Sequence, residues 1–121
     1  MYQQPNNRLQ KQTCIVTGAN SGIGRAVAVA MARDGANVVV NYVFGDEAAQ
    51  QVVDEIKQAG GTAIAIKADV SKEDQVIAMF QETVATFGTI DILVNNAGLQ
   101  RDSAFHNMTL KDWQFVRVKN F

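Results

Sequence analysis

The most constraining feature of the sequence is an alternation of short apolar runs with segments of helical periodicity. Four runs, TCIVTG, NVVVNY, TAIAIKADV and TIDILVNNAG, are rich in β-branched residues and carry apolar side chains without strict alternation. This composition is typical of strands that are covered on both faces of a sheet. Three segments with the spacing of amphipathic helices separate the four runs. The order therefore predicts parallel βαβ units.

Each of the three predicted helices has one apolar face and ends at glycine. GIGRAVAVAMARDG ends at its own last glycine, and the next two helices end at Gly60 and Gly88, since glycine is favoured just past a helix end. SKED (71–74) and TLKD (109–112) have the pattern of capping boxes, the second at the start of a further helix. The predicted apolar faces are Ile23, Val27, Ala30 and Met31, then Ala49, Val52, Val53 and Ile56, then Val76, Met79, Phe80, Thr83, Val84 and Phe87.

The predicted fold class is α/β, with a Rossmann-like doubly wound parallel sheet. Right-handed crossovers give the strand order 3-2-1-4, truncated after the fourth strand and the start of the following helix. Residues 1–10 are predicted to be a polar N-terminal tail and residues 11–121 one domain that is incomplete at its C-terminal end. In such sheets a ligand binds at the carboxyl ends of the strands, here between the first and the fourth.

Composition excludes several classes of function. The formal net charge is -1, so no basic excess indicates binding to nucleic acid or to an anionic membrane. No apolar run approaches the roughly 18 residues of a membrane helix, and the polar opening residues do not resemble a signal peptide. The single cysteine, Cys14, excludes an internal disulfide and fits a cytoplasmic protein, in which we expect it to be a small buried hydrophobe. We assign no metal site.

The segment TGANSGIG, residues 17–24, follows the first predicted strand and opens the first predicted helix. Gly18 lets the chain turn sharply, and Gly22 and Gly24 let backbone amides approach a ligand. The free N–H groups and the dipole at a helix N-terminus favour an anion such as a pyrophosphate. Because a strand precedes this pattern and a helix follows it, the segment indicates phosphate binding rather than a simple turn.

The glycine spacing Gly-x-x-x-Gly-x-Gly, ADV at 68–70 and NNAG at 95–98 together resemble the short-chain dehydrogenase/reductase family in its single-domain form. The resemblance runs from Gln12 to the last residue. VVVNY and EIKQAGGTAIAIKADVSKEDQV are most similar to glucose 1-dehydrogenase-like and 3-oxoacyl-carrier-protein reductase-like members. It implies an NAD(P)-binding domain, hydride transfer between nicotinamide and an alcohol or carbonyl carbon of a small molecule such as a sugar or ketone, and a homodimer or homotetramer.

The same resemblance implies roles for individual residues. Asp69 would accept from the adenine amino group with Val70 beside the ring, while helix decoration is the alternative role for Asp69. Asn95 would brace the sheet, and Ala97 and Gly98 would let the nicotinamide ribose approach, with a plain turn as the alternative. The complete predicted cofactor-binding set is Gly18, Ser21, Gly22, Ile23, Gly24, Asn41, Asp69, Val70, Asn95, Ala97 and Gly98.

The end of the second predicted strand bears on the choice of cofactor. NAD sites place an acid there for the ribose 2′-hydroxyl, whereas NADP sites need a cation for the 2′-phosphate. Asn41, Tyr42 and Val43 carry neither sign of charge, and Arg25 follows the last loop glycine. We therefore expect NAD(P), with a slight lean to NADP.

The catalytic residues of the family have few counterparts here. In the family a tyrosine acts as acid and base, a lysine four residues later lowers its pKa, and a serine holds the substrate oxygen. Tyr2 is followed four residues later by Asn6 and Tyr42 by Asp46, so Tyr-x-x-x-Lys is absent. Asn120 matches the helix asparagine of the family and is assigned a supporting catalytic role only.

We therefore expect the cofactor-binding half of an NAD(P)-dependent oxidoreductase, inactive on its own. The ending WQFVRVKNF is interpreted as a break within a longer enzyme rather than a natural boundary. The alternative is a non-catalytic nucleotide-binding fragment or pseudo-enzyme. A methyltransferase built on the same sheet fits less well, because its glycine loop lacks this spacing and NNAG has no role in it.

Overall fold

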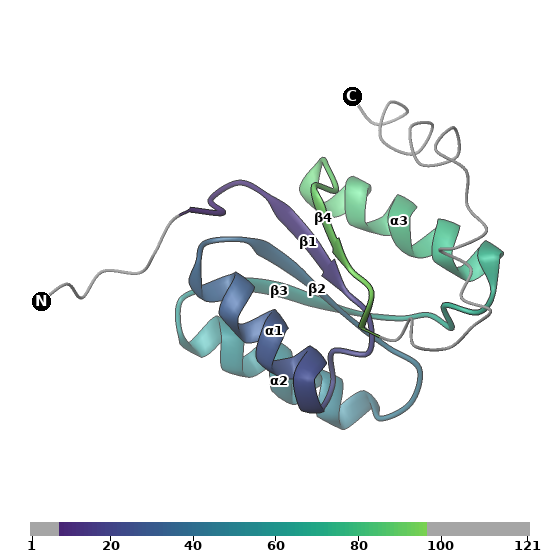
Figure 1. Ribbon diagram of the computed structural model, residues 1–121, viewed down its shortest axis with the longest axis horizontal. Coiled ribbons are helices and arrows are strands. Elements are labelled where there is room, and N and C mark those ends of the chain that lie inside the picture. Colours follow the sequence, from purple (N-terminus) through teal and green to yellow (C-terminus); the bar gives the residue numbers. More distant parts are fainter. Residues whose placement is uncertain (1–7, 97–121) are drawn as a thin grey trace, which may run out of the picture.

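Strands and helices alternate throughout the described chain, as the sequence predicts. The structure is a computed structural model that describes residues 8–96. No helix in this range is long and apolar enough to cross a membrane. In order, the elements are β1 (Thr13–Val16), α1 (Gly22–Arg33), β2 (Asn37–Tyr42), α2 (Asp46–Gln58), β3 (Thr62–Lys67), α3 (Glu73–Phe87) and β4 (Ile92–Val94) (Figure 1).

The four strands form one parallel sheet in the order β3-β2-β1-β4. At the carboxyl end of β1, Val16 lies opposite Val40 of β2 on one side and opposite Val94 of β4 on the other. The chain thus builds the sheet outward from β1 in one direction through β3 and then returns to add β4 on the opposite side. This confirms the predicted fold class and places the switch point between β1 and β4, where such sheets bind ligands.

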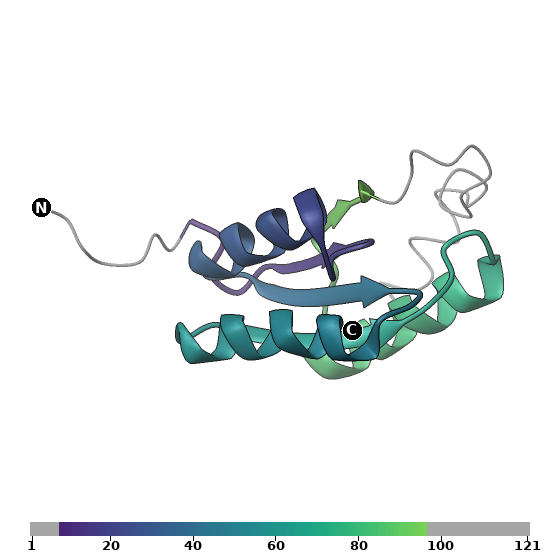
Figure 2. The same cartoon turned by 90° about the horizontal axis from the view of Figure 1, so that it is seen from below.

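Alternate side chains of each strand enter two hydrophobic clusters, one on each face of the sheet. Ile15 of β1 belongs to the cluster under α3, whereas Cys14 and Val16 belong to the cluster under α1 and α2. Helices α1 and α2 lie side by side on their face (Figures 1 and 2). Because both faces are covered, the strands are apolar on both sides, which explains their uninterrupted apolar runs.

Cys14 lies in the middle of the cluster under α1 and α2, as expected of a small hydrophobe. Its side chain is fully buried, and burial raises the pKa of its thiol to about 12. The thiol is therefore protonated at neutral pH and unreactive in the folded protein.

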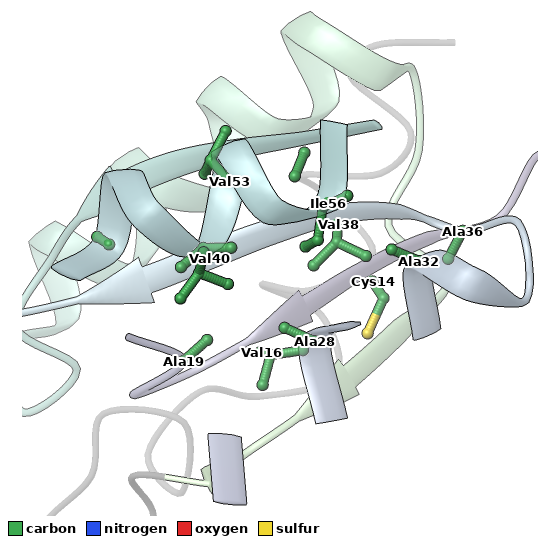
Figure 3. Packing of buried hydrophobic residues seen from close by; sticks show 13 residues of the cluster. Cys14, Val16, Ala19, Ala28, Ala32, Ala36, Val38, Val40, Val53 and Ile56 are labelled. Carbon is green, nitrogen blue, oxygen red and sulfur yellow. The ribbon is translucent and has the colours of Figure 1, made fainter. Parts of the chain in front are cut away.

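The buried face of α1 differs from the predicted one. Ile23 is 75% exposed and Ala30 is exposed, whereas Val27 and Met31 only border the cluster. The prediction followed the largest side chains, but close approach of α1 to the sheet selects the row with the smallest ones. Figure 3 shows Ala28 and Ala32 of α1 among the buried side chains of this cluster, with Ala28 beside Val16 of β1. The buried residues of α1 are Gly24, Ala28 and Ala32.

The predicted faces of α2 and α3 are confirmed, but the predicted cap of α3 is wrong. The N-cap residue is Lys72, which makes no side-chain cap hydrogen bond. The hydroxyl of Ser71 instead donates to the carboxylate of Asp69, a charge-assisted bond that is stronger than a neutral cap. The second predicted box, 109–112, lies outside the described residues. The buried residues are Ala49, Val52, Val53 and Ile56 in α2, and Val76, Met79, Phe80, Thr83 and Val84 in α3.

Residues 8–10, assigned to the polar tail, lie against the turn that follows α1. The N–H of Leu9 donates to the carbonyl of Asp34 at 2.9 Å, and the guanidinium of Arg8 lies 3.3 Å from the Asp34 carboxylate. The Leu9 side chain packs against the cluster under α1 and α2. The packed part of the chain therefore begins before the predicted boundary at residue 11.

Candidate functional site

The glycine loop leaves β1 at the carboxyl edge of the sheet and enters α1. Gly18 and Gly22 have φ angles of 61° and 59°, a region that glycine adopts without the steric cost of a Cβ. Ser21 is the exposed N-cap residue of α1 and makes no side-chain cap hydrogen bond. The N–H groups of the first turn of α1 are thus left without a side-chain cap, an arrangement that suits an anion.

Gly24 is required for a different reason than Gly22. A Cβ at Gly24 would overlap the carbonyl oxygen of Gly18 and lie 2.7 Å from the side-chain nitrogen of Asn96. A Cβ at Gly22 would meet nothing within 4 Å, so only the positive φ favours glycine there. Gly24 therefore lets the first turn of α1 pack directly on the loop, and Gly22 lets the loop turn into the helix.

Asn41, at the end of β2, lies beneath the glycine loop and is 1% exposed. Its Oδ1 accepts from the N–H of Gly18 at 3.4 Å, and its Nδ2 donates to the carbonyls of Ala68 at 3.1 Å and Ile66 at 3.3 Å. The carbonyl of Asn41 accepts from the N–H of Ala19 at 2.9 Å. The side chain is thus used within the protein, and its direct contact with a cofactor stays a prediction.

The residues after β4 contact the same loop from the other side. The Thr17 hydroxyl donates to the carbonyl of Val94 at 3.4 Å and to Oδ1 of Asn95 at 3.3 Å. The Nδ2 of Asn96 donates to the carbonyl of Gly18 at 3.3 Å. The first strand–helix junction and the end of β4 therefore form one connected surface at the switch point. The other predicted residues of this part, Ala97, Gly98 and Asn120, lie outside the described residues.

Asp69 follows β3 and is held in one orientation by Ser71. Its Oδ1 accepts from the Ser71 hydroxyl at 2.6 Å and from the Ser71 N–H at 2.9 Å, and these bonds hold the pKa of the Asp69 carboxyl below its usual value. The carboxylate is therefore ionised at neutral pH. Within residues 8–96 its Oδ2 accepts no hydrogen bond, so it is available to a donor. Val70 is 7% exposed and packs in the cluster under α3.

The turn between β2 and α2 brings a negative charge to the end of β2. Asp46, in the first turn of α2, lies near the hydroxyl of Tyr42, and burial, followed by the influence of the Asp46 carboxylate, raises the pKa of Tyr42. The chain reverses at Gly45, whose φ is 88°. Residues 41–43 alone do not indicate this acid, because the turn brings Asp46 back toward Tyr42 from four residues further along the chain.

The other side of that turn is tied to the glycine loop. Nδ2 of Asn20 donates to the carbonyl of Phe44 at 2.7 Å, while the Phe44 side chain is 82% exposed. Arg25, the candidate cation for a phosphate, lies 2.8 Å from Glu55 of α2 in an ion pair. The Arg25 guanidinium is therefore paired with an acid in this structure and stays partly exposed.

A glycine loop that opens a helix at the switch point of a parallel sheet is an arrangement typical of phosphate-binding α/β domains. The chain belongs to the short chain dehydrogenase family, whose sequence model matches residues 12–121. This establishes the family that the motifs at residues 17–24, 68–70 and 95–98 resemble.

Individual relatives agree with this assignment. The chain is 46% identical over 105 residues to a 3-oxoacyl-[acyl-carrier-protein] reductase of Staphylococcus aureus (strain Mu50). The aligned region covers 87% of this chain and 43% of the relative. It is 48% identical over 108 residues to the corresponding reductase of Synechocystis sp., with 89% and 44% covered. The chain therefore spans less than half the length of these curated relatives.

Solved structures show the same relationship. A short chain dehydrogenase from Mycobacterium avium superposes with a TM-score of 0.71 at 40% identity, over 93% of this chain and 45% of that one. A 7α-hydroxysteroid dehydrogenase complexed with NADH and 7-oxo-glycochenodeoxycholic acid superposes with a TM-score of 0.70 at 42% identity, over 78% of this chain and 37% of that one. The described fold is thus similar to the N-terminal part of the sheet in complete family members.

Proposed function

We propose that the chain is the dinucleotide-binding part of an NAD(P)-dependent oxidoreductase that moves hydride between nicotinamide and an alcohol or carbonyl carbon. The observation that carries this proposal is the glycine loop, in which the uncapped start of α1 and the turn at Gly18 face the switch point. An ionised carboxylate at Asp69 lies at the end of β3, on the same edge of the sheet. Membership of the family supports the same reading.

The chain's own residues divide the ligand between them. The first-turn N–H groups of α1 bind the pyrophosphate, because free donors and the helix dipole both favour an anion. The Oδ2 of Asp69 accepts from the adenine amino group. The segment after Asn95 approaches the nicotinamide ribose, with Ala97 and Gly98 as the predicted contacts. When bound, the nicotinamide supplies or accepts the hydride.

Proton transfer to the substrate oxygen has no assigned group in the printed sequence, since it contains no Tyr-x-x-x-Lys. A placed acid or base is worth about 10²–10⁴-fold in rate. We therefore propose that this chain binds the cofactor without turning over substrate, and Asn120 keeps only its supporting role. The same absence favours the second candidate function, a nucleotide-binding protein without catalysis.

Two features of the structure bear on the proposed choice between NAD and NADP. Arg25 is paired with Glu55, and Asp46 places a negative charge beside Tyr42. Asp46 follows Gly24 by about 20 residues, the separation at which an acid binds the ribose 2′-hydroxyl of NAD in dinucleotide-binding folds. We propose NAD as the preferred cofactor, in place of the lean to NADP.

The proposal covers the remaining properties of the protein as the family implies them. We propose a small-molecule substrate, such as a sugar or ketone, and a cytoplasmic homodimer or homotetramer in the whole enzyme. Nucleic acid and membranes are not among the proposed partners, because the net charge of -1 provides no basic excess.

Titration of the full chain with NADH, NADPH and ADP-ribose tests the proposal directly. We expect saturable binding of one molecule per chain, measured by calorimetry, with circular dichroism to establish that the protein is folded. ADP-ribose should retain most of the NADH affinity, since it contains both groups assigned to the described residues. A folded chain that binds none of the three ligands would contradict the proposal. Turnover of alcohols or ketones by the chain would favour a complete catalyst over a binding part.

A further inference from the structure

We propose that Asn41 is a positioning residue that fixes the spacing between Asp69 and the turn at Gly18, which leads into the pyrophosphate-binding first turn of α1. The inference rests on the proposed function, because it concerns how two contacts to one dinucleotide are kept in register. This role does not depend on the predicted direct contact between Asn41 and the cofactor. Asn41 acts through Gly18 on one side and through Ala68, the residue before Asp69, on the other.

The geometry of one buried carboxamide carries this inference. Asn41 is 1% exposed, and its side chain joins two segments that are 23 and 27 residues away in sequence. Oδ1 accepts from the N–H of Gly18, while the Nδ2 hydrogens reach the carbonyls of Ile66 and Ala68. Both donor hydrogens and one acceptor position of the amide are therefore used, so the side chain has one favourable orientation.

Hydrogen bonds hold both the N–H and the carbonyl group of Gly18. Asn41 holds the N–H of Gly18, and Asn96 holds its carbonyl at 3.3 Å. A third bond, 2.9 Å from the N–H of Ala19 to the carbonyl of Asn41, fixes the next residue of the loop. The turn cannot shift relative to β2 without breaking these bonds.

The other end of the link is equally defined. Ala68, whose carbonyl accepts from Asn41 at 3.1 Å, is followed directly by Asp69. The N–H of Asp69 donates to Oε1 of Gln75 at 2.7 Å, and its carboxylate is oriented by Ser71. A continuous path of hydrogen bonds and peptide units thus runs from the turn at Gly18 to the carboxylate of Asp69, which is assigned to adenine.

A purely structural role would stabilise the fold without affecting which base the protein prefers. A positioning role makes a further demand: the benefit of the adenine contact depends on the link. The two roles therefore differ in the ratio of affinities for two ligands that share the pyrophosphate and differ only at the base.

The test compares NADH with reduced nicotinamide hypoxanthine dinucleotide, which has an oxygen in place of the adenine amino group. We expect the wild-type chain to bind NADH roughly tenfold more tightly, because the analogue lacks the amino group that would donate to the ionised Asp69 carboxylate. Asn41→Ala should weaken NADH binding about tenfold and bring the ratio of the two affinities close to one, since a bond of this kind depends on correct geometry. Calorimetry at one temperature below the unfolding transition measures both affinities.

Val84→Ala is the matched control for a loss of stability. Val84 is 2% exposed near the end of α3, in the cluster on the face of the sheet opposite α1. Among residues 8–96, no hydrogen bond joins it to the glycine loop. This variant should lower the melting temperature and leave the ratio unchanged. Asn41→Asp keeps the shape of the side chain and replaces the donors, and it provides the same measurement if the alanine variant does not fold.

The outcomes separate this inference from the proposed function. A folded Asn41 variant that keeps the wild-type ratio, or a Val84→Ala variant that also loses it, overturns the positioning role alone. A wild-type chain that binds the two dinucleotides equally overturns the adenine contact of Asp69 and the positioning role with it. A folded wild-type chain that binds neither overturns the proposed function itself.

Discussion

The carbonyl oxygen of Gly18 occupies the space that a side chain at Gly24 would need. The two residues are six apart in sequence, and their contact brings the first turn of α1 onto the loop that precedes it. The loop is therefore a packed unit with backbone against backbone, rather than a flexible connection between β1 and α1.

Gly24→Ala should consequently displace α1 from the loop. We expect loss of dinucleotide affinity by at least tenfold and a lower melting temperature, because neither the Gly18 backbone nor Asn96 can move freely. The control is Gly22→Ala, which has open space but a φ of 59° and should cost about 1–2 kcal/mol of stability through backbone strain alone. Equal effects of both substitutions on stability and binding would contradict the distinction.

Ser71→Ala should raise the pKa of Asp69 toward its ordinary value, since the Ser71 hydroxyl is the largest cause of its lowering. The sign for stability follows: the carboxyl with the depressed pKa contributes stability above the ordinary aspartate pKa, and this is lost as pH falls through the lower folded value. Carbon-detected NMR titration of the Asp69 carboxyl measures the shift. Ser103→Ala, at a serine distant in sequence, is the control, and an unchanged Asp69 titration in Ser71→Ala would contradict the assignment.

Asp46→Asn should reduce the preference for NADH over NADPH, because it removes the negative charge beside the end of β2. The same variant should lower the pKa of Tyr42, whose raised value depends in part on Asp46. Ultraviolet titration in a Tyr2→Phe background isolates this tyrosine, since the sequence contains two.

Two controls accompany the Asp46 experiment. Asp54→Asn removes an acid from the exposed surface of the same helix, and Arg25→Ala breaks the ion pair with Glu55. Neither should change the ratio of NADH to NADPH affinity, and Arg25→Ala should cost less than about 1 kcal/mol because both partners are substantially exposed. A strong loss of NADPH binding in Arg25→Ala would restore the case for NADP.

Ala28→Leu should destabilise the protein by about 1–3 kcal/mol, because the side chain has no room between α1 and the sheet. Ile23→Ala should have little effect on stability, since Ile23 is 75% exposed. Chemical denaturation of the two variants measures both changes in the free energy of unfolding. The opposite ranking would restore the face of α1 expected from its largest side chains.

The arrangement of strands and helices was predictable because it depends on patterns that repeat over many residues. Apolar runs such as Val38–Val40 define strands buried on both faces, and crossover rules then leave few orders for the sheet. The glycine loop was predictable for a related reason, since its residues lie together in sequence between a strand and a helix.

The details that escaped prediction depend on tertiary contacts between distant residues. Nothing local to Asn41 indicates that its side chain points into the protein to join Gly18 with Ala68. The hydroxyl of Ser71 is drawn to Asp69 rather than to the helix, and Asp46 returns to Tyr42 only because the turn between β2 and α2 is tight. Each of these outcomes is a competition that sequence spacing alone does not decide.

The buried thiol of Cys14 has a practical consequence for experiments on this chain. β1 lies between β2 and β4 and carries the one cysteine of the sequence, which is fully buried. A thiol reagent can therefore modify the protein only when the layers around β1 separate. The rate of thiol labelling therefore measures how often the core opens. Slower labelling in the presence of a nucleotide would report its binding without any spectroscopic signal from the ligand.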